Sequence, residues 1–146
     1  GGGRTKKWNV IRVTPYHGGC NVVYVWLSFL IAGSKLLSSL LESESYQYLK
    51  KICDRLDTTM AGAGDYRDVC SYYGIDRYGI ASIYEKQMDG PSRTLIDYLA
   101  ATHEQLTVAE FVTVVRKVAK RGDVAKLLEE YEEELWERMA RFFHYR

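Results

Sequence analysis

Residues 107–128, TVAEFVTVVRKVAKRGDVAKLL, decide the fold class of this chain. Thr107 and Glu110 stand three residues apart, which is the spacing of a capping box at the start of a helix. Gly122 is expected to end that helix, and Asp123 is expected to cap the next one. The stretch therefore predicts two helices joined by a short turn. Apolar side chains mark one face of the first helix, at Val108, Phe111, Val112, Val115 and Val118.

The same pattern extends outward from this stretch in both directions. Further apolar stripes recur at helical spacing, and each must be buried against a neighbour. Asp65, Asp76 and Pro91 supply the expected helix starts between them. The sequence predicts an all-α fold, a six-helix antiparallel bundle over residues 43–146 with an extended last helix. The remaining stripes are Leu49/Ile52/Cys53/Leu56, Tyr66/Val69/Cys70/Tyr73, Ile80/Ile83/Tyr84, Leu95/Tyr98/Leu99/Thr102 and Val124/Leu127/Leu128/Tyr131/Leu135/Phe142.

Residues 1–42 are predicted to be a separate N-terminal extension. Trp8–Val13 and Asn21–Trp26 are rich in β-branched and aromatic side chains and flank a turn-forming TPYHGGC segment, so a hairpin and an extra helix both stay open. The apolar run Val22–Ala32 is shorter than the roughly 20 residues that span a bilayer. The three glycines that open the chain resemble a cloning remnant, and an artificial origin for part of the extension stays open.

Bulk composition argues against several classes of function. The chain has 146 residues, of which 47% are hydrophobic, enough for one domain with a core. A net charge of +1 gives no reason to expect a nucleic acid as partner. No cysteine or histidine completes a metal-ligand or nucleophile–base motif, so we expect no metal, no cofactor and no enzymatic activity. The side chains concerned are Cys20, Cys53, Cys70, His17, His103 and His144, and the odd cysteine count is typical of reduced thiols.

Charge is segregated along the last two predicted helices. Basic side chains gather at the turn between them, and acidic side chains follow over residues 129–137. Separated patches suit contacts with other proteins, because complementary patches steer encounter and set register. Head-to-tail contacts of this kind can also build open assemblies, so self-association is a further expectation. The basic side chains are Arg116, Lys117, Lys120, Arg121 and Lys126.

Two segments resemble a known family. Asp65–Ile75, DYRDVCSYYGI, is similar to the second helix of a death domain, whose pattern is D-W-R-x-L-A-x-x-L-G. Tyr66 stands where the family has tryptophan, and the basic residue and the closing glycine are kept. Gly90–Leu128 resembles the family's fourth to sixth helices. Over roughly Leu36–Phe142 the chain is therefore similar to the death-domain superfamily, which implies a Greek-key order of the six helices.

Within the superfamily, the glutamate-rich last helix with Trp136 is most similar to the adaptors associated with the ectodysplasin receptor. The resemblance implies a cytoplasmic signalling adaptor that binds the death domain of a receptor of the tumour-necrosis-factor receptor type. It also implies recruitment of ubiquitin-ligase or kinase adaptors toward NF-κB activation, with the membrane reached only through the receptor. The alternative is the cytoplasmic death-domain tail of a netrin- or neurotrophin-type receptor, with Val22–Leu41 as its membrane segment.

The resemblance implies three candidate contact surfaces. In the first, a corner of the fourth helix meets the corner of the fifth and sixth helices, and the fifth–sixth corner is favoured because its charge pattern is strongest. We expect Arg121→Glu to weaken receptor binding and to leave thermal stability nearly unchanged. The first contact sets Arg93 and Asp97 against Lys120, Arg121, Asp123 and Lys126; the third-helix residues are Arg77, Glu85 and Lys86; a third surface involves Lys50, Arg55, Arg67 and Asp68.

Overall fold

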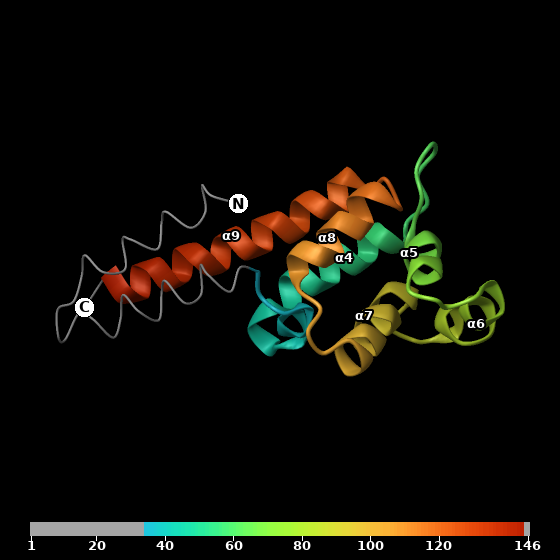
Figure 1. Cartoon of the computed structure of the whole chain (residues 1–146), viewed down its shortest axis with the longest axis horizontal. Coiled ribbons are helices and arrows are strands. Elements are labelled where there is room, and N and C mark those ends of the chain that lie inside the picture. The colour runs from blue at the N-terminus through green and yellow to red at the C-terminus, as the bar shows by residue number, and fades with distance from the viewer. Residues whose placement is uncertain (1–33, 145–146) are drawn as a thin grey trace, which may run out of the picture. The chain divides into compact units, whose positions relative to one another are not determined.

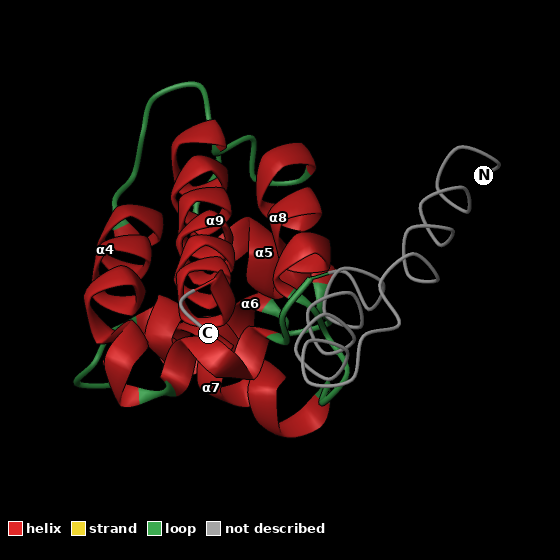
Figure 2. Cartoon of the chain, turned by 90° about the vertical axis from the view of Figure 1, so that its left-hand side faces the viewer, coloured by secondary structure: helices red, strands yellow, loops and turns green. Residues whose placement is uncertain are grey.

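The computed structural model describes residues 34–144 (Figure 1). Within that range the chain is all-α, as predicted, and Figure 2 shows only helices joined by loops. The predicted hairpin or helix of Trp8–Val13 and Asn21–Trp26 lies outside the described residues. The described elements are η1 (Leu37–Leu41), η2 (Ser43–Ser45), α4 (Tyr46–Asp57), α5 (Tyr66–Tyr72), α6 (Arg77–Ser82), η3 (Tyr84–Lys86), α7 (Pro91–Thr102), α8 (Val108–Lys117) and α9 (Gly122–His144), where η marks a short 3-10 helix.

Polar caps start three of these helices where the sequence predicts them. The Asp65 side chain accepts a hydrogen bond from the Arg67 backbone, and Asp76 accepts one from the Gly79 backbone. The predicted capping box of α8 forms in full: the Glu110 backbone donates to the Thr107 hydroxyl over 3.2 Å, and the Thr107 backbone donates to the Glu110 carboxylate over 3.0 Å. These bonds satisfy backbone donors that have no partner inside the helix.

Three described glycines have a positive φ, which other residues rarely adopt, and two of them lie at helix ends. Gly74, with φ at 91°, follows α5 and ends it as predicted. Gly90 also has φ at 91° and precedes α7. A Cβ atom there would meet an Asp57 carboxylate oxygen at 2.7 Å, and that carboxylate accepts the Ser92 backbone N–H over 3.0 Å. Glycine is needed because Asp57 closes tightly on the start of α7.

One compact unit covers residues 35–132 and contains a continuous apolar core. Helix α7 packs against α4, η1 and η3, and α5 contacts α6, α7 and α8. Helix α6 contributes little to the core, because Ile80 is its only buried side chain. The members of the core with no exposed surface are Leu40, Ile52, Leu56, Val69, Cys70, Leu95, Ile96, Leu99, Val108, Phe111, Val115, Ala119, Val124, Ala125 and Leu128.

The segment before α4 is held by backbone hydrogen bonds to the residues around the start of α8. The Leu37 backbone donates to the Leu106 carbonyl over 2.8 Å, and the Val108 backbone donates to the Lys35 carbonyl over 2.8 Å. The Ser39 hydroxyl lies 2.6 Å from the Tyr131 hydroxyl, where both groups are buried. Packing of the bundle therefore includes residues on the N-terminal side of position 43, where the sequence predicts the domain to begin.

The turn between α8 and α9 differs from its prediction. The left-handed residue is Lys120, with φ at 54°, whereas Gly122 begins α9 and does not end α8. Asp123 therefore lies in the first turn of α9 and is not its capping residue. Val118 is partly exposed, because α8 ends at Lys117 and the chain turns away from the predicted stripe.

The second half of α9, residues 133–144, belongs to a different compact unit. The extended last helix is confirmed as a helix of 23 residues. In its second half Arg138 pairs with Glu134 over 3.4 Å, one helical turn away. Among residues 34–144, no helix is both long and apolar enough to cross a membrane. Most of the candidate membrane segment Val22–Leu41 lies outside the described residues.

Candidate protein interfaces

Arg121 is a structural residue of the interior, which corrects its prediction as a surface contact. Its side chain is 1% exposed. The guanidinium donates to the backbone carbonyls of Arg55, Thr58 and Gly64 over 2.8, 2.8 and 3.2 Å. It also forms two parallel hydrogen bonds of 3.0 Å with the carboxylate of Asp123. A guanidinium that is fully paired inside the protein offers no charge to a partner.

The rest of the predicted corner consequently offers less free charge to a partner than the sequence suggests. Asp123 faces Arg121, and hydrogen bonding from Arg121 lowers the pKa of its carboxyl below the ordinary value. Lys120 and Lys126 are exposed. Arg116 on α8 is paired with Glu129 on α9 through two hydrogen bonds of 2.8 and 3.1 Å. The corner keeps two exposed lysines, while its strongest charges are satisfied within the chain.

Arg93 and Asp97 pair with each other along α7. The Arg93 Nε atom lies 3.3 Å from an Asp97 carboxylate oxygen, a contact between residues one turn apart. Exposed pairs of this kind contribute at most about 1 kcal/mol. The structure therefore places these two predicted contacts together on one helix, where their charges balance.

The surface around α6 combines charge with exposed apolar side chains. Tyr78 is 81% exposed, Tyr72 is 58% exposed and Ile83 is 52% exposed. Arg77 begins α6, and the predicted residues Glu85 and Lys86 lie in η3 directly after it. Exposed tyrosine beside arginine is typical of the residues that dominate binding at protein interfaces. We call these six residues the α6 surface.

A hollow of about 540 Å³ adjoins this surface between α5, α6 and η3. One of its lining residues, Glu85, accepts hydrogen bonds from the Tyr66 hydroxyl over 2.5 Å and from Arg67 Nε over 3.3 Å. Arg67 also stacks over the Tyr66 ring, 4.8 Å from its centroid. Burial raises the pKa of the Tyr66 hydroxyl, and the hydrogen bond to Glu85 is the second largest cause of this increase. The hollow is lined by Arg67, Asp68, Ser71, Arg77, Ile80, Ala81 and Glu85.

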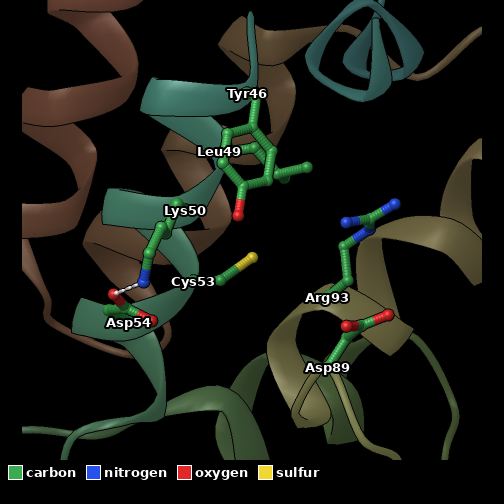
Figure 3. Close-up of a pocket in the computed structure, with 7 residues that line it drawn as sticks. All are labelled: Tyr46, Leu49, Lys50, Cys53, Asp54, Asp89 and Arg93. Atoms are coloured by element: carbon green, nitrogen blue, oxygen red, sulfur yellow. Dashed lines mark hydrogen bonds and ion pairs between the residues drawn. The ribbon is translucent and has the colours of Figure 1, made fainter. Parts of the chain in front are cut away.

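A second hollow of about 170 Å³ lies between α4 and the start of α7 (Figure 3). Helix α4 supplies an apolar wall of Tyr46 and Leu49, and the Cys53 sulfur points into the space. Arg93 and Asp89 face them from the opposite side. On the α4 side Lys50 pairs with Asp54 over 3.1 Å.

The two described cysteines are buried, and the described histidine contacts neighbouring polar and aromatic side chains. Burial raises the pKa of both Cys53 and Cys70 to about 12, so each thiol stays protonated at neutral pH. His103 Nδ1 lies 2.8 Å from the Thr102 hydroxyl, and its ring contacts Tyr73 and Tyr98. In the described part of the chain no group of three or more potential ligands could hold a metal ion.

Sequence reasoning identified the charged residues of the α6 surface and missed its apolar ones. The sequence pattern predicts that Ile83 belongs to a buried stripe, but α6 ends at Ser82 and the side chain is exposed. Tyr78 lies off the stripe that contains Ile80. Its position on the polar side of a short helix is a sequence signal that could have predicted its exposure. Met88, at 97% exposure, was also missed.

Comparison with known proteins adds no relative to this description. No protein-family model, no curated protein sequence and no solved structure matches the chain.

Proposed function

We propose that this chain is a protein-interaction adaptor of the death-domain type, which acts by docking on another helical domain. The observation that carries the proposal is the α6 surface, where exposed Tyr78, Tyr72 and Ile83 adjoin Arg77, Glu85 and Lys86. Helix α6 has a single buried side chain, so most of it is available to a partner. Large apolar side chains within a charged border are typical of binding sites.

The order of the helix starts supports the death-domain assignment. A capping box opens α5 at Asp65, Asp76 caps α6, Pro91 opens α7 and a second capping box opens α8 at Thr107. Asp65, Pro91 and Thr107 belong to the segments on which the sequence resemblance rests, and we propose a Greek-key arrangement of α4 to α9. The proposed partner is the death domain of a receptor of the tumour-necrosis-factor receptor type, in the cytoplasm. Recruitment of ubiquitin-ligase or kinase adaptors toward NF-κB belongs to the same proposal.

The proposed docking surface differs from the one that the sequence favoured. The α8–α9 corner loses Arg121 to the interior, and Arg116 is paired with Glu129. The α6 surface keeps both its cations at the surface and adds apolar area that can be buried on binding. Apolar side chains that become buried at an interface contribute most of its free energy, whereas charged pairs at the rim mainly set orientation.

Calorimetric titration of the full chain with purified receptor death domains tests this function. Domains of the tumour-necrosis-factor receptor type are compared with those of netrin and neurotrophin receptors. Tyr78→Ser and Arg77→Glu are each expected to weaken binding roughly tenfold or more. Lys126→Glu at the α8–α9 corner is the matched control and should change the affinity little.

Two results would overturn the proposal. If no receptor death domain binds the folded chain, the adaptor function is wrong. If Lys126→Glu abolishes binding while Tyr78→Ser leaves it intact, the docking surface is the corner and not α6. Circular dichroism of each variant establishes that the fold is retained.

A further inference from the structure

The most exposed apolar side chain of the described unit belongs to a tight turn. Met88 is 97% exposed, whereas the other exposed large apolar side chains range from 38% to 81%. The turn is closed by a hydrogen bond of 3.1 Å from the Gly90 backbone to the Gln87 carbonyl, which places Met88 and Asp89 at its tip. The left-handed Gly90 and the Asp57 carboxylate behind it hold this turn against the start of α7.

The turn borders the hollow between α4 and α7. Asp89, the residue after Met88, lines the hollow together with Arg93 (Figure 3). The opposite wall offers the Tyr46 ring, Leu49 and the Cys53 sulfur. A protruding methionine and a hollow with one apolar wall therefore lie within one small patch of the surface. Methionine fills irregular apolar recesses well, because its side chain is flexible and polarizable.

The patch carries charges of both signs, so it can complement the same patch on a second copy of the chain. Within residues 34–144 the Asp89 carboxylate has no ion pair or side-chain hydrogen bond. Arg93 uses only Nε in its pair with Asp97, so its two terminal nitrogens remain available among the described contacts. A two-fold contact repeats every interaction: where residue i meets residue j of the partner, residue j also meets residue i. Arg93 of each copy would then face Asp89 of the other.

We propose that the chain forms a two-fold symmetric dimer in which Met88 of each copy enters the α4–α7 hollow of the other. Two reciprocal ion pairs between Arg93 and Asp89 border the two methionine contacts. None of the residues of this patch is among the six of the α6 surface, although Met88 follows Lys86 by two positions. The contact is small, and interfaces of this size give weak, concentration-dependent association.

The test measures the mass of the full chain by light scattering and sedimentation over a wide range of concentrations. The mass is expected to rise from the 16.8 kDa of one chain to twice that value and to stop there. Met88→Ser should raise the dissociation constant roughly tenfold or more, since it removes both reciprocal apolar contacts. Tyr78→Ser is the matched control and should leave dimerisation unchanged, although it weakens the proposed receptor contact.

A charge exchange makes the test specific. Arg93→Asp alone sets two carboxylates against each other in the dimer, and Asp89→Arg alone sets two guanidinium groups against each other. Each variant should therefore be monomeric, because like charges at an interface are strongly unfavourable. An equimolar mixture of the two variants restores both opposite-charge pairs and should dimerise. The doubly substituted chain should also dimerise.

Several outcomes would overturn the dimer. They are a chain that stays monomeric at every concentration, an assembly that grows beyond two copies, or a mixture of the two charge variants that does not associate. Dimerisation that persists in Met88→Ser with unchanged affinity would also contradict it. A failure of receptor binding with intact dimerisation would instead concern the proposed function alone.

Discussion

Arg121 and Arg77 lie in two regions of the same bundle that differ in their relation to water. Arg121, at the α8–α9 turn, is enclosed and makes five hydrogen bonds of 2.8 to 3.2 Å. Arg77, at the start of α6, is exposed on a helix with one buried side chain. The first arginine joins its own turn to residues 55–64, a stretch distant in sequence, whereas the second can serve a partner. Charge in a sequence therefore does not indicate which of these roles a residue has.

The largest expected effect separates the two regions by stability. Arg121→Glu places a carboxylate among three carbonyl oxygens and beside Asp123, so we expect a loss of about 3–5 kcal/mol in the free energy of unfolding. Denaturation in urea measures it. Arg77→Glu is the matched control and should stay within about 0.5 kcal/mol of the original chain. Equal stability of the two variants would show that the network around Arg121 does not hold the bundle together.

The second prediction makes the same comparison with apolar side chains. Leu128 of α9 has no exposed surface, whereas Ile83 after α6 is half exposed. Leu128→Ala should cost about 2–5 kcal/mol, because it removes buried methyl groups and leaves a cavity. Ile83→Ala should cost less than about 0.5 kcal/mol. Thermal unfolding of both variants measures the difference, and a large loss in Ile83→Ala would mean that α6 is covered.

The third prediction uses pH to examine the Arg121–Asp123 pair. Hydrogen bonding from Arg121 holds the pKa of Asp123 below its ordinary value of 3.8. An acid with a lowered pKa stabilises the folded state above its unfolded pKa, and this stabilisation is lost as the pH falls through the folded pKa. Stability should thus decrease on acidification below about 4, and Asp123→Asn should reduce that dependence.

Asp57 contributes to the same pH profile with the opposite sign. Burial raises its pKa, so its ionisation weakens the folded state as the pH rises. Only the difference between Asp123→Asn and the original chain isolates Asp123. Asp97→Asn, in the exposed pair on α7, serves as the control. An unchanged acid profile in Asp123→Asn would contradict the strength assigned to the pair.

The smallest expected effect concerns the turn itself. Lys120 has φ at 54°, a conformation that costs a side chain about 1–2 kcal/mol. Lys120→Gly should remove that cost and gain less than about 1 kcal/mol, because glycine is also freer in the unfolded chain. Lys117→Gly, at the last residue of α8, should instead lose up to about 0.5 kcal/mol. Two changes of the same sign in chemical denaturation would contradict this account of the turn.

The helices could be predicted because their signals are local. The capping box of Thr107 and Glu110 and the cap of Asp65 depend on residues within one turn, and all form as expected. The apolar stripes likewise predicted most of the buried side chains. Ile83, Tyr98 and Val118 are exceptions, because each is exposed. For Ile83 the reason is the end of α6 at Ser82, which depends on how little of that helix the bundle covers.

The candidate site could be predicted only in part, because burial of a charge depends on distant residues. The groups that bind Arg121 are backbone carbonyls of residues 55, 58 and 64. Every residue carries such a carbonyl, so the side chains at these positions do not reveal the contact. Nothing near Arg121 in the sequence distinguishes it from exposed Lys120. The charged residues Arg77, Glu85 and Lys86 were placed on a surface as expected, while the exposure of Tyr78 required the structure.

The hydrogen bond between the first residue of the compact unit and α9 has a consequence for protein engineering. The Lys35 backbone donates to the Glu132 carboxylate over 2.8 Å, so the chain enters and leaves the compact unit 35–132 at one point. A unit whose ends meet can be grafted into a loop of a host protein without stretching either connection. Such a chimera would display the α6 surface on a scaffold of choice, detached from the flanking sequences.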